Sequence, residues 1–144
     1  MIRSELAAVP GPAARVASGV PEYRPGACNI GPAEIARRRR TGHLGLAVTL
    51  LVLAALMALG LPSVARLVLV IPAAVSAAGY LQAWLKFCAA YGSLGVFNFG
   101  AVGKTQQVAE GNARRRDRRK ALQIGLASFL IGIAVGLAAF LLPL

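Results

Sequence analysis

Three long apolar stretches constrain this chain more than any other feature. They cover Leu44–Leu61, Leu67–Lys86 and Ala121–Leu144, and charged residues occur only at their edges. A helix needs roughly 20 mainly apolar residues to cross the hydrocarbon core of a bilayer, and each stretch has about that length. With 57% hydrophobic residues overall, the chain is too apolar for an ordinary soluble domain. We therefore expect an all-α membrane protein with three transmembrane helices.

The connections between these stretches suggest an antiparallel hairpin followed by a third span. Only the short turn Pro62–Arg66 separates the first two stretches, so their helices should lie side by side. Before the first stretch, Gly31 can cap a helix, Pro32 suits its first position, and Glu34 places negative charge in its first turn. We expect a short interfacial helix here that leads into the first span.

The basic residues predict how the chain is oriented. The net charge is +11, but the arginines cluster beside the apolar stretches, which favours a membrane role over nucleic-acid binding. Residues 28–43 and 86–120 hold twelve of the sixteen basic residues, four in the first segment and eight in the second. The positive-inside rule then places the N-terminus in the cytoplasm and the C-terminus across the inner (plasma) membrane. Contacts with anionic headgroups are expected from Arg37, Arg38, Arg39, Arg40, Arg114, Arg115 and Arg116.

These features divide the chain into four parts. Residues 1–27 contain four prolines and should form a flexible cytoplasmic tail. Residues 28–103 form the hairpin with its interfacial ends, residues 104–120 a basic cytoplasmic loop that is partly helical, and residues 121–144 the third span. The first residues lack a charged region followed by an apolar one, so the first span should act as the insertion signal.

The glycine-rich segment 87–103 leaves three alternatives open. It is too short and too rich in glycine for a comfortable fourth span. The helix of the second span could run on past Lys86, or the segment could lie along the interface with its aromatic rings among the headgroups. A re-entrant loop would need surrounding protein to satisfy its backbone.

Small residues in the third span predict close helix packing. Ser128, Gly132 and Gly136 recur at four-residue spacing, which lets a neighbouring backbone approach. The neighbour could be the chain's own first two spans. It could equally be a second copy or another membrane protein, and the sequence favours neither.

The two cysteines raise the possibility of thiol chemistry. The predicted topology puts Cys28 and Cys88 at the same interface, and a helix start and an arginine cluster near Cys28 would favour its thiolate. A reducing cytosol and the common use of cysteine as a small apolar residue argue for a packing role instead. His43 is the only histidine, which leaves a thiol-metal site without enough ligands.

No catalytic pattern is present in the sequence. The five acidic residues all lie outside the apolar stretches, so no charged pair marks an ion or proton path through a membrane. We expect no enzymatic activity and no cofactor.

Short motifs at the two ends of the predicted hairpin resemble those of a known family. Asn29-Ile30-Gly31, the arginine run and apolar hairpin that follow, and Phe87-Cys88 with Gly95-Val96-Phe97-Asn98 resemble the YgaP-like transmembrane family. That family is a two-helix inner-membrane module, in some members fused to a rhodanese sulfurtransferase domain. The resemblance covers about residues 28–98 and implies a hairpin whose Asn-Ile-Gly and Cys…Gly…Asn ends are important. This chain adds a third span and lacks the rhodanese domain, so no sulfurtransferase activity carries over.

Two functions remain under consideration. The first is an accessory or scaffold subunit that packs against itself or another membrane protein without catalysis. The alternative is a cytoplasmic-face thiol module that handles sulfur or redox equivalents. Under either hypothesis, we expect a functional junction where the ends of the hairpin meet, formed by Cys28, Asn29, Gly31, Cys88, Gly95 and Asn98.

Overall fold

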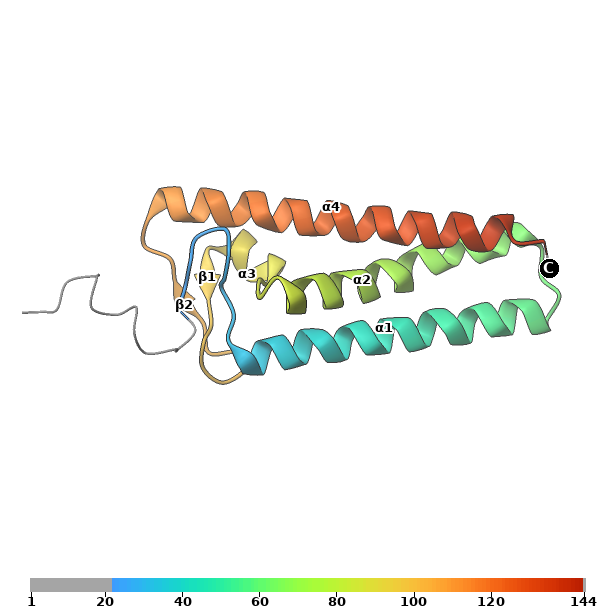
Figure 1. The fold of residues 1–144 in the computed structure, drawn as a ribbon, viewed down its shortest axis with the longest axis horizontal. Helices are drawn as coiled ribbons and strands as arrows, with labels where there is room; N and C mark the ends of the chain where they lie inside the picture. Colours follow the sequence, from blue (N-terminus) through green and yellow to red (C-terminus); the bar gives the residue numbers. More distant parts are fainter. Residues whose placement is uncertain (1–21, 144) are drawn as a thin grey trace, which may run out of the picture.

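The computed structural model describes residues 22–143, and this part of the chain is mostly helical (Figure 1). Residues 1–21 of the predicted flexible tail therefore lie outside the described residues. Within residues 22–143, three helices are long and apolar enough to cross a membrane, as the sequence predicts. In chain order the elements are α1 (Pro32–Ala58), the 3-10 helix η2 (Ser63–Leu69), α2 (Val70–Trp84), α3 (Ala89–Leu94), β1 (Val96–Phe97), β2 (Gln106–Gln107) and α4 (Gly111–Leu141).

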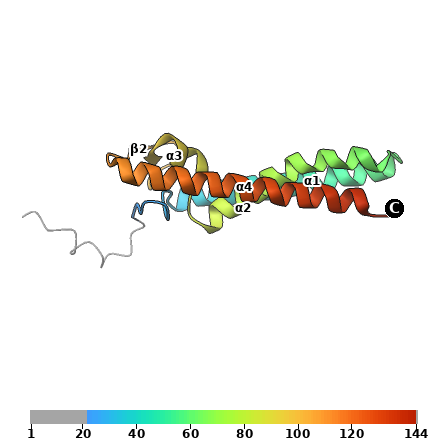
Figure 2. The ribbon, with the colours of Figure 1, turned by 90° about the horizontal axis from the view of Figure 1, so that it is seen from above.

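Helix α2 lies between α1 and α4 and packs against both (Figures 1 and 2). Helices α1 and α4 run in the same direction, and α2 runs against them. The N-terminal turns of α1 and α4 therefore lie at the same end of the molecule, and they carry Arg37–Arg40 and the basic residues of 114–120. We call this end the basic end and the opposite one the Pro62 end.

The structure corrects the prediction of a separate interfacial helix before the first span. The helix begins as predicted, with Gly31 at the N-cap, Pro32 in the first turn and Glu34 following. It then continues without a break to Ala58, so the arginines and the first apolar stretch belong to one helix. No proline interrupts residues 33–58, and an α-helix without such an interruption keeps its hydrogen-bond ladder.

Helix α4 likewise joins two segments that the sequence suggested were separate. It begins at Gly111, so the helical part expected within residues 104–120 is the first turns of the same helix that contains the third span. The remaining connection is short and contains β2, which pairs antiparallel with β1. No sequence pattern predicted these two-residue strands.

The segment after α2 folds back as a compact cap at the basic end. Helix α2 ends at Trp84, so the alternative in which it runs on past Lys86 is wrong. Lys86 has a φ of 53°, a left-handed conformation that ends helices. Helix α3 then ends in the same way at Gly95, whose φ is 70°, and the chain enters β1.

Glycines bring the long helices into close contact. A Cβ on Gly79 of α2 would lie 2.3 Å from the backbone nitrogen of Gly42, and one on Gly45 would lie 2.7 Å from that of Ser76. On α4, a Cβ on Gly132 would lie 2.6 Å from the carbonyl oxygen of Val70. Such contacts leave no room for a side chain and hold helices together by van der Waals packing.

The small-residue ridge of the third span packs within the chain. Gly132 and Gly136 face the start of α2, and Ser128 is buried and donates its hydroxyl to the Ile124 carbonyl. Of the two alternatives for this ridge, the structure has the contact with the chain's own second span.

Candidate functional site: the polar junction at the basic end

The two ends of the hairpin are joined by the side chain of Asn29. Its Nδ2 donates to the Cys88 carbonyl oxygen at 3.0 Å, and its Oδ1 accepts from the Cys88 backbone N–H at 2.7 Å. Both residues are fully buried. One amide therefore satisfies both backbone groups of Cys88, which would otherwise be costly to bury.

A short backbone bridge extends this contact to Asn98. The Asn98 N–H donates to the Asn29 carbonyl at 2.9 Å, and the Gly31 N–H donates to the Asn98 carbonyl at 2.8 Å. Gly31 is needed here because an added Cβ would lie 2.9 Å from the Cα of Phe99. The predicted residues Asn29, Gly31, Cys88 and Asn98 thus meet in one place.

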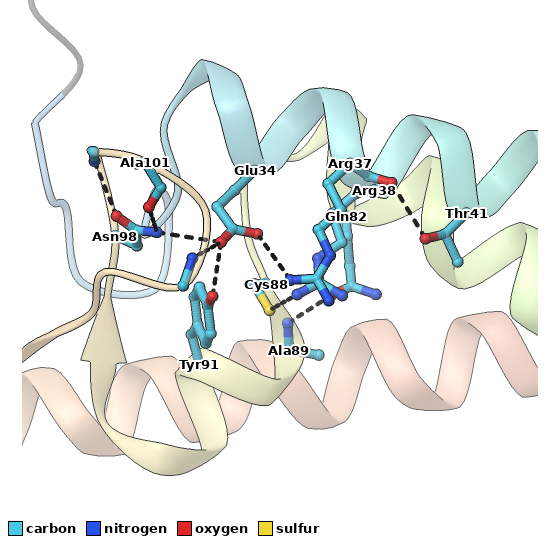
Figure 3. A network of polar contacts seen from close by, with 12 residues as sticks. Glu34, Arg37, Arg38, Thr41, Gln82, Cys88, Ala89, Tyr91, Asn98 and Ala101 are labelled. Atoms are coloured by element: carbon cyan, nitrogen blue, oxygen red, sulfur yellow. Dashed lines mark hydrogen bonds and ion pairs between the residues drawn. The ribbon is translucent and has the colours of Figure 1, made fainter.

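A buried carboxylate lies at the centre of this network (Figure 3). Oε1 of Glu34 accepts from the Tyr91 hydroxyl at 2.8 Å, the Gly103 N–H at 3.1 Å and the Asn98 amide at 3.2 Å. Its second oxygen, Oε2, lies 3.9 Å from the guanidinium of Arg37. We call Asn29, Glu34, Arg38, Cys88, Tyr91 and Asn98 together the polar junction.

The contacts of Glu34 favour its ionised form. Glu34 lies ahead of the apolar part of α1, which begins at Leu44. Burial alone would raise its pKa, but the hydrogen bonds from Tyr91, Gly103 and Asn98 together hold the pKa below its ordinary value. Burial raises the pKa of Tyr91, and its bond to Glu34 raises it further, so the phenol stays a donor.

Arg38 connects the junction to the thiol of Cys88. Its Nη2 donates to Sγ of Cys88 at 2.9 Å, and its guanidinium lies 5.9 Å from the centre of the Tyr91 ring. Figure 3 shows Arg38 and Arg37 reaching toward the junction from consecutive positions of α1. Arg38 is therefore partly buried within the protein, whereas the sequence placed it on the membrane surface.

The two cysteines are buried and unbonded. Sγ of Cys28 lies near the Ile30 carbonyl at 3.9 Å, whereas Sγ of Cys88 contacts Arg38. Their segments adjoin, because Asn29 follows Cys28 and holds Cys88, but the two sulfurs have different partners. His43 contacts neither cysteine; its Nδ1 lies 2.7 Å from the Tyr80 hydroxyl.

A second buried carboxylate fastens the start of the described chain to α4. Asp117 accepts from the Tyr23 hydroxyl and from the Gly26 N–H, each at 2.7 Å. Burial and this hydrogen bond both raise the pKa of Tyr23, so its phenol remains protonated. The Tyr23 ring also stacks on Phe97 of β1, with 4.8 Å between ring centres.

The other predicted site residues lie at the edge of the junction. Gly95 packs against the Arg114 side chain, whose Nε donates to the Val108 carbonyl. Arg115 and Arg116 are exposed on α4, as are Arg39 and Arg40 on α1. These four arginines remain available for contacts outside the chain.

Sequence reasoning missed the central residues of the site. Glu34 was assigned only a role in the helix start, and Tyr91 only an interfacial one. Asp117 was not singled out at all. A usable signal was present, because Glu34 and Asp117 are isolated acids beside arginine clusters, where nearby positive charge favours an ionised carboxylate.

The arrangement is suited to holding segments together. Within residues 22–143, no group of three His, Cys, Asp or Glu side chains is placed to hold a metal ion. Oε1 of Glu34 and both carboxylate oxygens of Asp117 accept from the chain's own donors, and Cys88 is fully buried. Comparison of the chain with protein-family models, with curated proteins and with solved structures finds no match.

Proposed function

We propose that this protein is an accessory subunit of the inner membrane, which binds a transmembrane helix of another protein and has no catalytic activity of its own. The observation that carries this proposal is an apolar groove between α1 on one side and η2 and α2 on the other. It has a volume of about 490 Å³, and its lining includes Leu44, Gly45, Val48, Val68 and Ile71.

The groove is suited to a helix rather than to a polar ligand. Its walls are formed mainly by branched aliphatic side chains. Leu44 is 68% exposed and Ile71 equally so, so both can contact a neighbour. Helix packing in lipid depends on such fitted surfaces, because lipid tails are as apolar as the helices.

A partner other than a second copy fits the groove better. In a two-fold symmetric dimer the same surface patch serves both subunits, so a second copy would have to seat an exposed ridge of its own in the groove. The small-residue ridge of α4 is no substitute, because α2 already covers it. A helix from a different protein can supply the ridge that the groove lacks.

The polar junction supports a structural role over thiol chemistry. A reactive cysteine must be reached by its substrate, and Cys88 is fully buried beneath Arg38 and α1. The hydrogen bonds of Asn29 and Glu34 are made to the chain itself. In this proposal, the junction keeps the hairpin rigid so that the groove holds its shape.

The membrane orientation and the family are parts of the same proposal. Both basic clusters lie at one end of the molecule, which supports a cytoplasmic basic end. The residues that resemble the YgaP-like family, Asn29, Gly31, Cys88 and Asn98, meet in the polar junction. Their meeting supports membership in that family.

Photo-crosslinking in native membranes tests the proposed partner. A photoreactive amino acid replaces Val48 in the groove, and a matched variant carries it at Leu126 on the exposed face of α4. We expect one discrete protein adduct from position 48 and none from position 126, since only the first position lines the groove.

The proteins present in the position-48 adduct distinguish a different partner from a second copy of this chain. Mass spectrometry should find peptides of one other membrane protein in the position-48 adduct. An adduct containing two copies of this chain, equal adducts from both positions, or lipid adducts alone would each contradict it.

A further inference from the structure

A second cavity opens at the basic end, on the other flank of α1. It has a volume of about 510 Å³, and its lining includes Ile30, Ile35, Arg39, Ala83, Trp84 and Lys86. Arg39 and Val48 are nine residues apart on α1, which places them roughly half a turn apart around the helix axis. The cavity is therefore separate from the groove.

Two basic side chains from different elements converge on this cavity. Arg39 comes from α1 and Lys86 from the turn after α2, and both are exposed. Within residues 22–143, no acidic side chain lines the cavity and neither cation forms an ion pair. The cavity thus presents uncompensated positive charge above an apolar floor.

Lys86 has a backbone conformation that favours a different residue. Its φ of 53° is left-handed, and glycine or asparagine adopts this region with less strain. The Asn29 N–H donates to its carbonyl at 3.2 Å, which helps to hold the turn. Glycine would therefore suit the turn better than lysine. What lysine contributes instead is a positive charge that lines the cavity.

The remaining surface around the cavity matches an acyl chain. Trp84 is 80% exposed, and an exposed tryptophan at the end of an apolar helix is typical of the bilayer interface. Leu46 and Leu50 follow Arg39 at helical spacing on the same flank of α1, and both are exposed. An amphiphile with its charged group at Arg39 could lay its chain along these leucines.

We propose that this cavity binds an anionic phospholipid, with its phosphate between Arg39 and Lys86 and its upper acyl chain against Ile35, Trp84 and Leu46. The positive charge of the cavity matches a headgroup with a net negative charge, in which no amine neutralises the phosphate. A free phosphate would leave the apolar lining uncovered, so the membrane lipid is the ligand that fits the whole surface.

Trp84 makes this proposal directly measurable, because it is the only tryptophan in the chain. The full chain is reconstituted in phosphatidylcholine vesicles, and phosphatidylglycerol brominated near the top of its acyl chains is titrated in. Brominated phosphatidylcholine serves as the reference. We expect phosphatidylglycerol to quench Trp84 fluorescence at a several-fold lower mole fraction.

Charge removal at the cavity should abolish this preference. Each basic residue near anionic lipid contributes about fivefold in affinity, so Arg39→Gln with Lys86→Gln should remove a preference of at least that size. The matched control, Arg118→Gln with Arg119→Gln, removes two charges from the exposed start of α4 and should retain the preference. A similar loss in both variants would show diffuse surface charge and overturn the proposal.

A single variant separates binding from folding. Lys86→Gly relieves the left-handed strain, so its thermal midpoint should equal or exceed that of the wild type. Its preference for brominated phosphatidylglycerol should nevertheless fall about fivefold. An unchanged preference in this stable variant would exclude Lys86 from the site and contradict the proposal.

Discussion

At the scale of single residues, the fold depends on two buried carboxylates. Glu34 and Asp117 are each completely inaccessible to solvent, and each accepts from a tyrosine hydroxyl and a backbone N–H. A buried charge is tolerated only when such partners replace water. In both cases the partners are far away in sequence, so each carboxylate fixes a loop to a long helix.

The first prediction concerns Glu34 and pH. Because its folded pKa is lowered, its contribution to stability is complete above the unfolded pKa of about 4.3 and is lost as the pH falls through the folded pKa below that. Glu34→Gln should lower the free energy of unfolding at pH 6 by about 2 kcal/mol. It should also flatten the acid-side decline that thermal unfolding in detergent shows for the wild type below pH 4.

The matched control for this prediction is Glu110→Gln. Glu110 is exposed and makes no side-chain capping bond, so its substitution should leave both the midpoint and its pH dependence nearly unchanged. If Glu34→Gln showed the same decline below pH 4 as the wild type, Glu34 would not be the group that links folding to pH.

At the scale of elements, glycine decides how the helices cross. Gly79 and Gly42 face each other so closely that neither has room for a side chain, and Gly45 faces Ser76 one turn further along α1. The Ser76 hydroxyl uses this approach to donate to the Gly42 carbonyl at 2.8 Å. The crossing of α1 and α2 is therefore set by backbone contacts.

The second prediction tests this crossing with Gly79→Ala. The new Cβ would lie 2.3 Å from the nitrogen of Gly42, and neither helix backbone can yield without separating. We expect a loss of about 1–3 kcal/mol in the free energy of unfolding, measured by circular dichroism in mild detergent. Gly125→Ala on α4 is the control, because a Cβ there meets nothing within 4 Å, and it should leave stability unchanged or raise it. Equal effects of the two substitutions would contradict close packing at Gly79.

At the scale of the whole molecule, the three helices are fastened at both ends. The polar junction and Asp117 join the segments at the basic end. At the Pro62 end, the buried Arg66 of η2 donates to the carbonyls of Ala139 at 3.2 Å and Leu142 at 3.0 Å. Ala139 lies in the last turn of α4 and Leu142 directly follows the helix, and the last carbonyls of a helix lack partners within it.

The third prediction follows from this contact. Arg66→Gln should cost about 2 kcal/mol and accelerate amide hydrogen exchange in residues 138–142, while residues 121–128 nearer the basic end keep their protection. Arg66→Lys retains the charge but not the fork of donors, so its effect should be smaller. Uniform acceleration along α4 would show that Arg66 acts on global stability and not on the end of α4.

The sequence by itself determined the three apolar helices, the start of α1 at Gly31 and Pro32, and the gathering of basic residues beside the spans. These features depend on composition and local spacing, which the chain displays directly. It also indicated Asn29, Gly31, Cys88 and Asn98 as one junction, through a resemblance.

Only the tertiary structure decided what those residues contact. Glu34 accepts hydrogen bonds from residues 57 to 69 positions away, and no local pattern encodes such partners. The sequence likewise did not predict that α1 and α4 continue without a break from their arginines into their apolar spans, because a change of polarity does not interrupt a backbone hydrogen-bond ladder. Gly42 and Gly79 are in contact because the turn at Pro62 brings their helices together. Close packing depends on the fit between two helix surfaces, and neither stretch of sequence encodes that fit alone.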